Sequence, residues 1–329
     1  MNVAIRQREP LVLGIDIGGT KILSAVVDAE NAVLGRGKRP TPFKSGHALL
    51  TQELLASVTE ALAEADVPAA ALRAIGVGAP GPLDPPAGVL LRTVNLAVKS
   101  YPLGSILKEQ YHVPVLVDND VNMACFGEFK AGAARGTQNV IGLWIGTGIG
   151  GCVIIDGRVV IGANRNAGEI GHIVLDAALR KQDSRRGTLE FEASKTAIQR
   201  LLEKWTKEGH HTSLQKSAGG NMHRLNSSDL AKAFESGDKL AVKAVQHSAW
   251  YLGIAVANLF NILSPDLFVL GGGIAESLGG SYLKLVDEAA NEYVYTTELA
   301  PIRLALAALG GDAGVIGAAI AAREALLGT

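Results

Sequence analysis

LVLGIDIGGTKILSAVVDAENAVLG, residues 11–35, contains two apolar runs rich in β-branched residues, joined across Gly18 and Gly19. A third segment, NAVLGRGKRP at residues 31–40, follows the turn AEN. Short apolar runs bounded by Gly and Asn are typical of strands. The stretch therefore predicts three strands in a meander built around a glycine turn.

The same pattern recurs at residues 140–162, VIGLWIGTGIGGCVIIDGRVVIG. The second copy reads strand, glycine turn, strand, an Asp156-Gly157 hairpin and a third strand. Two copies of one meander indicate a duplicated α/β architecture with a cleft between its halves. At this point, chance similarity between two glycine-rich hairpins remains the alternative.

Alternating strand and helix patterns fill most of the rest of the chain. A helix is predicted over 47–65, where Leu50, Leu54, Val58 and Leu62 share one face. We also expect buried strands at 74–80 and 113–120, a helix over 121–134, helical structure over 227–263, a strand, glycine turn and helix over 267–277, and a final helix over 311–327 with Asp312 as its N-cap. The polar stretch 205–227 is expected to be a flexible loop.

Composition excludes several classes of protein. A chain of 329 residues that is 48% hydrophobic and 19% charged has enough apolar material for two ordinary domains. A net charge of −1 gives no electrostatic reason to expect nucleic acid or membrane partners. The apolar stretches are too short to span a bilayer, and the N-terminus lacks a signal-peptide pattern. With only Cys125 and Cys152 present, we expect a cytoplasmic protein.

Three glycine turns follow predicted strands. Glycine lets successive backbone N–H groups approach phosphate oxygens, and hydroxyl and ammonium groups add further donors. Asp16 can hold Mg²⁺ through its waters. A tight hairpin is the alternative for any single turn, and neither a Walker loop nor a Rossmann fingerprint is present. The expected nucleotide ligands are Asp16, Gly18, Gly19, Thr20, Lys21, Gly146, Thr147, Gly148, Gly150, Gly271, Gly272 and Gly273.

Seven segments together resemble a known family. In order they are GIDIGGTK, GVGAPGPLD, NDVNMACFGE, IGTGIGGCVIIDG, GEIGH, NILSPDLFVLGGGI and GDAGVIGAA. This order is similar to that of the ROK family of repressors, open reading frames and sugar kinases. The resemblance implies the two-domain actin/hexokinase/Hsp70-like (ribonuclease H-like) α/β fold, in which the duplicated meanders are phosphate hairpins. We expect one domain over 1–120 with 312–329, and another over 121–311.

The resemblance also implies which groups carry the chemistry. Phosphoryl transfer to a sugar hydroxyl needs positioning, charge neutralisation and an acceptor for the hydroxyl proton. In the family's Asn-Asp motif the second residue is the base, here Asp120, and Asn119 binds a sugar hydroxyl. From the residues alone, Asp120 could equally cap the helix that begins near Val121, while Asp118 orders the strand end.

The sugar pocket is expected to be rich in Asn and carboxylates. By resemblance, Asn95, Glu169, His172 and Glu190 bind sugar hydroxyls. The alternatives are a loop asparagine at Asn95 and an exposed acid at a helix start for Glu190. ATP and Mg²⁺ are the expected cofactors.

One segment departs from the family pattern. Most members carry three cysteines after the ExGH motif, and these bind a structural zinc together with the histidine. Here Lys181, Asp183 and Thr188 stand at the cysteine positions. Such side chains cannot build a thiolate zinc site, so we expect no bound zinc. Ion pairs among the basic and acidic residues of 181–192, or a mobile loop, are the expected replacements.

The expected activity is ATP-dependent phosphorylation of a hexose, at C6 of glucose or a related sugar. N-acetylhexosamines, mannose, fructose and allose are alternative substrates, and polyphosphate is an alternative donor. A sugar-sensing repressor is disfavoured because about ten residues precede Leu11, where family repressors carry a helix-turn-helix. Intact motifs likewise disfavour a sugar-binding protein that has lost activity. Family members often form dimers or tetramers, so we expect a homo-oligomer, a dimer foremost.

Overall fold

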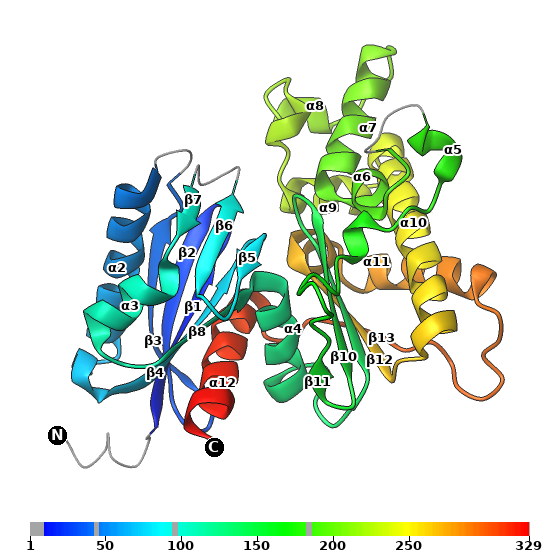
Figure 1. Cartoon of the computed structure of the whole chain (residues 1–329). Helices are drawn as coiled ribbons and strands as arrows, with labels where there is room; N and C mark the ends of the chain where they lie inside the picture. The colour runs from blue at the N-terminus through cyan, green and yellow to red at the C-terminus, as the bar shows by residue number, and fades with distance from the viewer. Residues whose placement is uncertain (1–9, 43–45, 94–97, 182–185, 329) are drawn as a thin grey trace. The chain divides into compact units, whose positions relative to one another are not determined.

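The computed structural model describes residues 10–42, 46–93, 98–181 and 186–328. The chain separates into two compact units, residues 1–135 with 311–329 and residues 136–310 (Figure 1). The helix α4 (Asp120–Ala131) lies in the first unit because it packs along α12 (Ala313–Leu327). The units therefore divide after α4, whereas the sequence suggested a division at residue 120.

The first unit is built on a five-stranded sheet. Its spatial order is β3 (Val33–Pro40), β2 (Lys21–Val27), β1 (Leu11–Ile17), β4 (Leu72–Ala79) and β8 (Val115–Asn119). The first three strands form the predicted antiparallel meander, and β4 and β8 extend the sheet in parallel from β1. The carboxyl ends of β1, β4 and β8 consequently meet at one edge of the sheet.

Helices cover both faces of this sheet (Figure 1). On one face α2 (Gly46–Glu64) buries Leu50, Leu54 and Val58, as its periodicity predicted. On the other face α12 approaches the strands at van der Waals distance. A Cβ at Gly14 or Gly76 would lie 1.9 Å from a carbonyl oxygen of that helix, so only glycine fits at these two positions.

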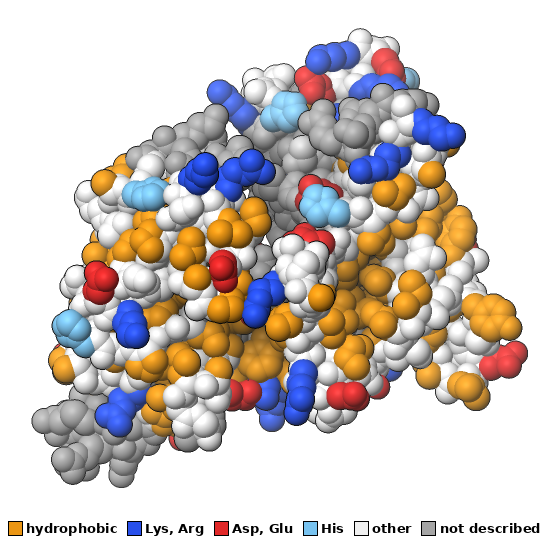
Figure 2. All heavy atoms as spheres, in the orientation of Figure 1, with side chains coloured by type: hydrophobic (Ala, Val, Ile, Leu, Met, Phe, Trp, Pro, Cys, Tyr) orange, Lys and Arg blue, Asp and Glu red, His pale blue; other side chains and the backbone are white. Residues whose placement is uncertain are grey.

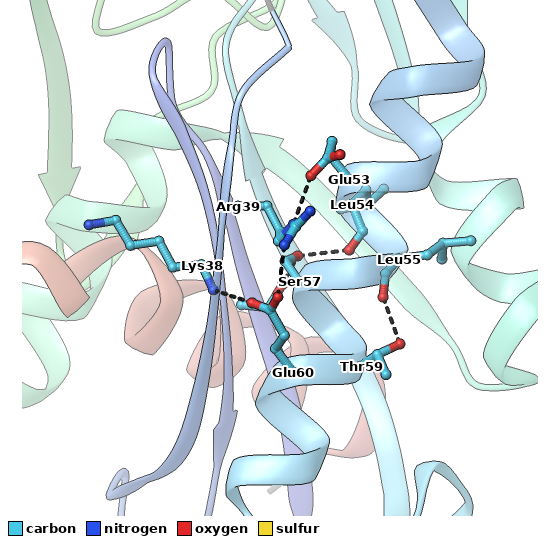
Figure 3. Close-up of polar contacts among 9 residues, drawn as sticks. Lys38, Arg39, Glu53, Leu54, Leu55, Ser57, Thr59 and Glu60 are labelled. Atoms are coloured by element: carbon cyan, nitrogen blue, oxygen red, sulfur yellow. Dashed lines mark hydrogen bonds and ion pairs between the residues drawn. The ribbon is translucent and has the colours of Figure 1, made fainter.

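Polar contacts fix α2 against β3 (Figure 3). The Arg39 guanidinium bridges Glu53 at 2.7 Å and Glu60 at 3.1 Å, and Glu60 also accepts a hydrogen bond from the backbone N–H of Lys38. Beneath this pair, the buried hydroxyl of Ser57 donates to the carbonyl of Leu54. The helix is thus held in one register along the strand.

A small antiparallel sheet and one helix lie between β4 and β8 in the sequence. They are β5 (Leu83–Asp84), β6 (Val89–Thr93), β7 (Val98–Tyr101) and α3 (Leu103–Tyr111). A short 3-10 helix, η1 (Ala69–Ala71), comes directly before β4. The strands have two to five residues, too few for a periodic sequence signal. Their buried members, Leu90, Val98 and Tyr101, join the core of the first unit.

The second unit repeats this plan. Its sheet has the order β11 (Arg158–Val159), β10 (Ile149–Ile155), β9 (Val140–Ile145), β12 (Leu267–Gly271) and β13 (Leu304–Leu306). As in the first unit, a meander of three antiparallel strands is extended by two parallel strands. The duplication predicted from residues 11–35 and 140–162 is confirmed, and chance similarity is excluded.

Long helices form the rest of the second core. The longest are α10 (Lys239–Leu263) and α11 (Gly272–Tyr293). The others are η2 (Ile170–His172), α5 (Ala177–Arg180), α6 (Leu189–Ala193), α7 (Lys195–Lys207) and α9 (Ser227–Glu235). One face of α10 is buried along its length, and the helix is ended by Ser264, its C-cap, in the left-handed conformation. None of the described helices combines the length and the apolar character that crossing a membrane requires.

The prediction of a flexible loop over 205–227 was wrong. The segment contains the end of α7, then α8 (Leu214–Ser217) and η3 (Met222–Arg224). Leu214, Met222 and Leu225 are buried in the core of the second unit. Isolated apolar anchors between polar residues have no periodicity, so tertiary burial orders a stretch that local patterns describe as loop.

Asp312 occupies the predicted N-cap position of α12 but does not cap the helix with its side chain. At the start of α12 its carboxylate makes no capping hydrogen bond and pairs instead with Arg36 of β3 at 2.6 Å.

On the face drawn in Figure 2, basic side chains are interspersed with acidic and uncharged ones.

Candidate active site

Asp16 lies near the carboxyl end of β1, at the edge where the parallel strands of the first unit end. In the sheet it stands beside Gly78 of β4, which in turn stands beside Asp118 of β8. Asp120 follows two residues later as the first residue of α4. The fold therefore brings Asp16 to the same edge of the sheet as the segment of Asp118 and Asp120, which lies about a hundred residues later in the chain.

The environment of Asp16 favours its neutral form. Burial, followed by the negative charge of Asp120, raises the pKa of Asp16 to about 7, and the nearby Lys21 opposes this with a smaller effect. The first turn of α12 packs directly against this carboxyl group, since a Cβ at Gly314 would lie 2.8 Å from its Cγ. A cation placed here would relieve the repulsion between the two carboxylates.

The β8–α4 junction orients Asp120. The Oδ1 atom of Asn119 accepts hydrogen bonds from Val121 N and Asn122 N, so Asn119, not Asp120, is the N-cap of α4. Asp118 accepts from Asn119 N at 2.6 Å and from the Asn122 amide at 3.2 Å. Asp120 accepts from Val121 N at 3.0 Å and remains only partly buried.

The first glycine turn joins β1 to β2. Gly18 N donates to Lys21 O at 2.9 Å, which closes the turn. From beyond β3, the Thr41 hydroxyl donates to Gly18 O and the Thr41 N–H donates to Thr20 O. Gly19 and Thr20 are exposed at the tip, and Lys21 is partly buried.

In the second unit, the other two glycine segments meet at the carboxyl ends of β9 and β12. The turn after β9 is closed by a hydrogen bond from Gly146 N to Gly148 O at 2.9 Å. In the neighbouring strand, Gly271 stands beside Trp144 of β9. Gly272, with a φ of +85°, packs on the backbone of Ile145, where any Cβ would clash. These segments thus form one surface at the start of α11. Gly150, within β10, is paired with Trp144.

The predicted sugar ligands of the second unit also converge. Glu169, the N-cap of η2, and His172, its last residue, are exposed, with His172 Nε2 3.9 Å from Glu169 Oε2. Glu190, in α6, lies against η2, because a Cβ at Gly171 would come within 3.4 Å of the Glu190 Cβ. Its Oε2 accepts a hydrogen bond from Ile149 N at 2.9 Å. Asn95 lies outside the described residues.

The described residues at the positions expected for zinc ligands do not offer the donors that a zinc ion needs. Lys181 is exposed, and Thr188 is buried, where its hydroxyl caps α6 by accepting from Phe191 N. Asp183 is outside the described residues. Both cysteines are buried in other elements, Cys125 in α4 and Cys152 in β10. Among the described residues, no group of three or more His, Cys, Asp or Glu side chains could hold a metal.

Backbone pairing and one buried carboxylate close this segment instead. Leu175 N and Asp176 N both donate to Gly187 O, and Gly187 N donates to Glu192 Oε1 at 3.0 Å. Glu192 Oε2 lies 3.5 Å from His247 Nε2 of α10. Burial alone would raise the pKa of Glu192, but contacts with His247 and Gly187 N outweigh it and lower that pKa. The sequence analysis expected the acidic residues of 181–192, Glu192 among them, to form ion pairs within that segment. It did not predict a contact with His247.

Three supporting residues were not among the predicted site residues, although Gly314 lies within the segment GDAGVIGAA. Thr41 donates to the first glycine turn, Gly314 packs against the Asp16 carboxyl group, and Thr196 donates to the second glycine turn. Each is distant in the sequence from the group that it contacts. Their residue types are ordinary for a loop, a helix start and a helix surface. Only the tertiary arrangement identifies them.

Comparisons with known proteins agree over almost the whole chain. The model of the ROK family matches residues 12–325. A glucokinase from Halalkalibacterium halodurans is 34% identical over 308 residues, covering 93% of this chain and 92% of that protein. The crystal structure of a ROK family glucokinase from Streptomyces griseus, in complex with glucose and AMPPNP, matches with a TM-score of 0.82 and 30% identity over 95% of this chain and 99% of that chain.

The ROK hexokinase of Thermus thermophilus matches with a TM-score of 0.77 and 32% identity, over 97% of this chain and all of that one. These likenesses confirm the α/β fold expected from the duplicated meanders, that of the ROK hexokinases. The chain belongs to the ROK family.

Proposed function

We propose that the protein is an ATP-dependent hexose kinase that phosphorylates the C6 hydroxyl of glucose or a closely related sugar. The observation that carries this proposal is the placement of Asp120 beside Asp16 at the open end of the parallel strands. The similarity to a glucokinase whose structure holds glucose and AMPPNP supports the sugar and the donor.

In this proposal Asp120 accepts the proton of the attacking hydroxyl. Asn119 is the cap of α4, and the carboxylate of Asp120, at the first residue of the helix, accepts from Val121 N and is partly exposed. The negative charge of Asp120 also disfavours ionisation of Asp16 until a cation is present. General-base assistance of this kind contributes about 10²–10⁴-fold to a rate.

The oxygen donors near Asp16 fit a hard divalent cation. Asp16 would hold Mg²⁺ through water, and the ion would neutralise charge on the transferred phosphoryl group. We assign phosphate binding to residues 18–21 and 146–150, and adenosine contact to residues 271–273. Their closed turns and exposed tips support this assignment.

We assign the sugar hydroxyls to Asn95, Asn119, Glu169, His172 and Glu190. The convergence of the last three around η2 supports a common ligand. Because the stereochemistry of a hexose is recognised by geometry rather than by residue type, N-acetylhexosamines, mannose, fructose and allose remain the alternative substrates.

A coupled assay of ADP release across these sugars tests the proposal. We expect turnover that requires Mg²⁺ and is highest with glucose. Sugar binding without ADP release from any of them would favour a sugar-sensing regulator. A parallel assay with polyphosphate identifies the donor.

We propose a cytoplasmic location, with which the two free, buried cysteines agree. By analogy with the family we propose a homodimer, which light scattering coupled to size-exclusion chromatography would establish or exclude.

A further inference from the structure

The second glycine turn is hydrogen-bonded to the segment that links α6 to α7, residues 190–196, here named the α6–α7 junction. Three bonds connect them. Glu190 Oε2 accepts from Ile149 N at 2.9 Å, Lys195 N donates to Gly146 O at 2.9 Å, and the Thr196 hydroxyl donates to Thr147 O at 2.7 Å. The first glycine turn has a different support, the hydroxyl of Thr41, which donates to Gly18 O.

The junction itself is capped and packed into the core of the second unit. Ser194 ends α6 and begins α7, and its Oγ accepts from Ala197 N at 3.2 Å. Ala193, Ser194 and Ala197 are buried against the core of the second unit. The groups that hold the turn are therefore attached to packed helices and not to a loop.

These bonds determine where the amides of the turn point. In a planar trans peptide the C=O and the N–H of one unit point in opposite directions. Holding Gly146 O and Thr147 O toward α7 consequently directs the N–H groups of Thr147 and Gly148 away from it. Neither of these N–H groups donates a hydrogen bond to any residue within the described ranges. Two successive amides directed outward in this way form an anion-binding concavity.

We propose that the α6–α7 junction presents the second glycine turn to the nucleotide phosphates, and that Thr196 is a positioning residue for nucleotide binding. The inference rests on the proposed kinase function and deepens it. Thr196 itself need not touch the nucleotide, because it acts through the peptide unit that joins Thr147 to Gly148. Glu190, assigned above to a sugar hydroxyl, holds the other end of the same turn through one of its two oxygens.

The test replaces the hydroxyl of Thr196 and leaves the shape of the side chain. Thr196→Val removes the donor to Thr147 O, and we expect the Kd for Mg·AMPPNP, measured by calorimetry without sugar, to rise about threefold to tenfold, the effect of one hydrogen bond. The KM for ATP should rise in parallel and the KM for the sugar should stay within about twofold of wild type, as expected if the bond acts only on the phosphate turn. Thr196→Ser, which keeps the hydroxyl, should restore wild-type values.

Thr206→Val is the matched control. Thr206 lies near the other end of α7 and donates to Glu203 O within its own helix, so the same substitution there should leave nucleotide affinity unchanged. Thr196→Ala repeats the test without a β-branched side chain at the helix start.

Equal nucleotide affinity in Thr196→Val, Thr206→Val and wild type would overturn the inference and leave the kinase proposal standing. Failure of Thr196→Ser to restore affinity, or a matching rise in the KM for sugar, would also overturn it. If wild-type protein binds no nucleotide, the proposed function and this inference both fail.

Discussion

Asp16 makes the stability of the ligand-free protein depend on pH. Folding raises the pKa of Asp16 from the ordinary value of 3.8 to about 7. Between these pH values the folded state therefore holds the proton more tightly than the unfolded state does. Stability from this group is therefore greatest below pH 3.8, falls as pH rises toward 7, by at most about 1.4 kcal/mol per unit, and is constant above 7.

Asp16→Asn should remove this dependence. Relative to wild type, the variant should gain free energy of unfolding progressively from about pH 4 to pH 7 and then keep a constant advantage, because it buries no ionisable group. Urea denaturation of the ligand-free proteins at several pH values measures the difference. Glu109→Gln, on the exposed surface of α3, is the control. A difference between Asp16→Asn and wild type that does not change with pH would contradict the raised pKa.

At the scale of the elements, the turn after β9 depends on one close approach. A Cβ at Gly148 would lie 2.1 Å from Glu190 Oε2, so Gly148→Ala forces that carboxylate to move and breaks its bond to Ile149 N. We expect a loss of about 1–3 kcal/mol in the free energy of unfolding. Urea denaturation without ligand measures it.

Gly146→Ala is the control in the same turn, because the nearest atom to its added Cβ is 4.0 Å away. It should change the free energy of unfolding by less than about 0.5 kcal/mol. Equal losses from the two substitutions would show that the Glu190 contact does not matter for the turn.

The elements differ in how far the sequence predicts them. The two meanders were predictable because their inner strands, such as β1 and β10, are short and mostly apolar and flank a glycine turn, a purely local property. The strands β5–β7, the ordered segment 205–227 and the Arg36–Asp312 pair were not, since they depend on contacts between distant residues.

The candidate site shows the same division. Asp16, Asp120 and the glycine turns lie at strand ends that the sequence marks clearly. By contrast, the pKa of Asp16, the capping role of Asn119 and the support from Thr196 follow from burial and packing, which a linear pattern does not record.

For the whole molecule, the account predicts a fold that needs no structural zinc. The segment around Gly187 is closed by backbone hydrogen bonds and by Glu192. Elemental analysis of purified protein should find far less than one zinc per chain, and chelator treatment should leave activity unchanged once Mg²⁺ is restored. A stoichiometric zinc whose removal abolishes activity would contradict this prediction.

The central claim is that this molecule is a hexose kinase in which Asp120 accepts the hydroxyl proton. The most direct measurement is kcat for Asp120→Asn, beside the Kd for glucose and the unfolding curve of the same variant. The account predicts a folded protein that still binds glucose, with kcat lower by about 10²–10⁴-fold. A folded variant that phosphorylates glucose at nearly the wild-type rate would contradict it.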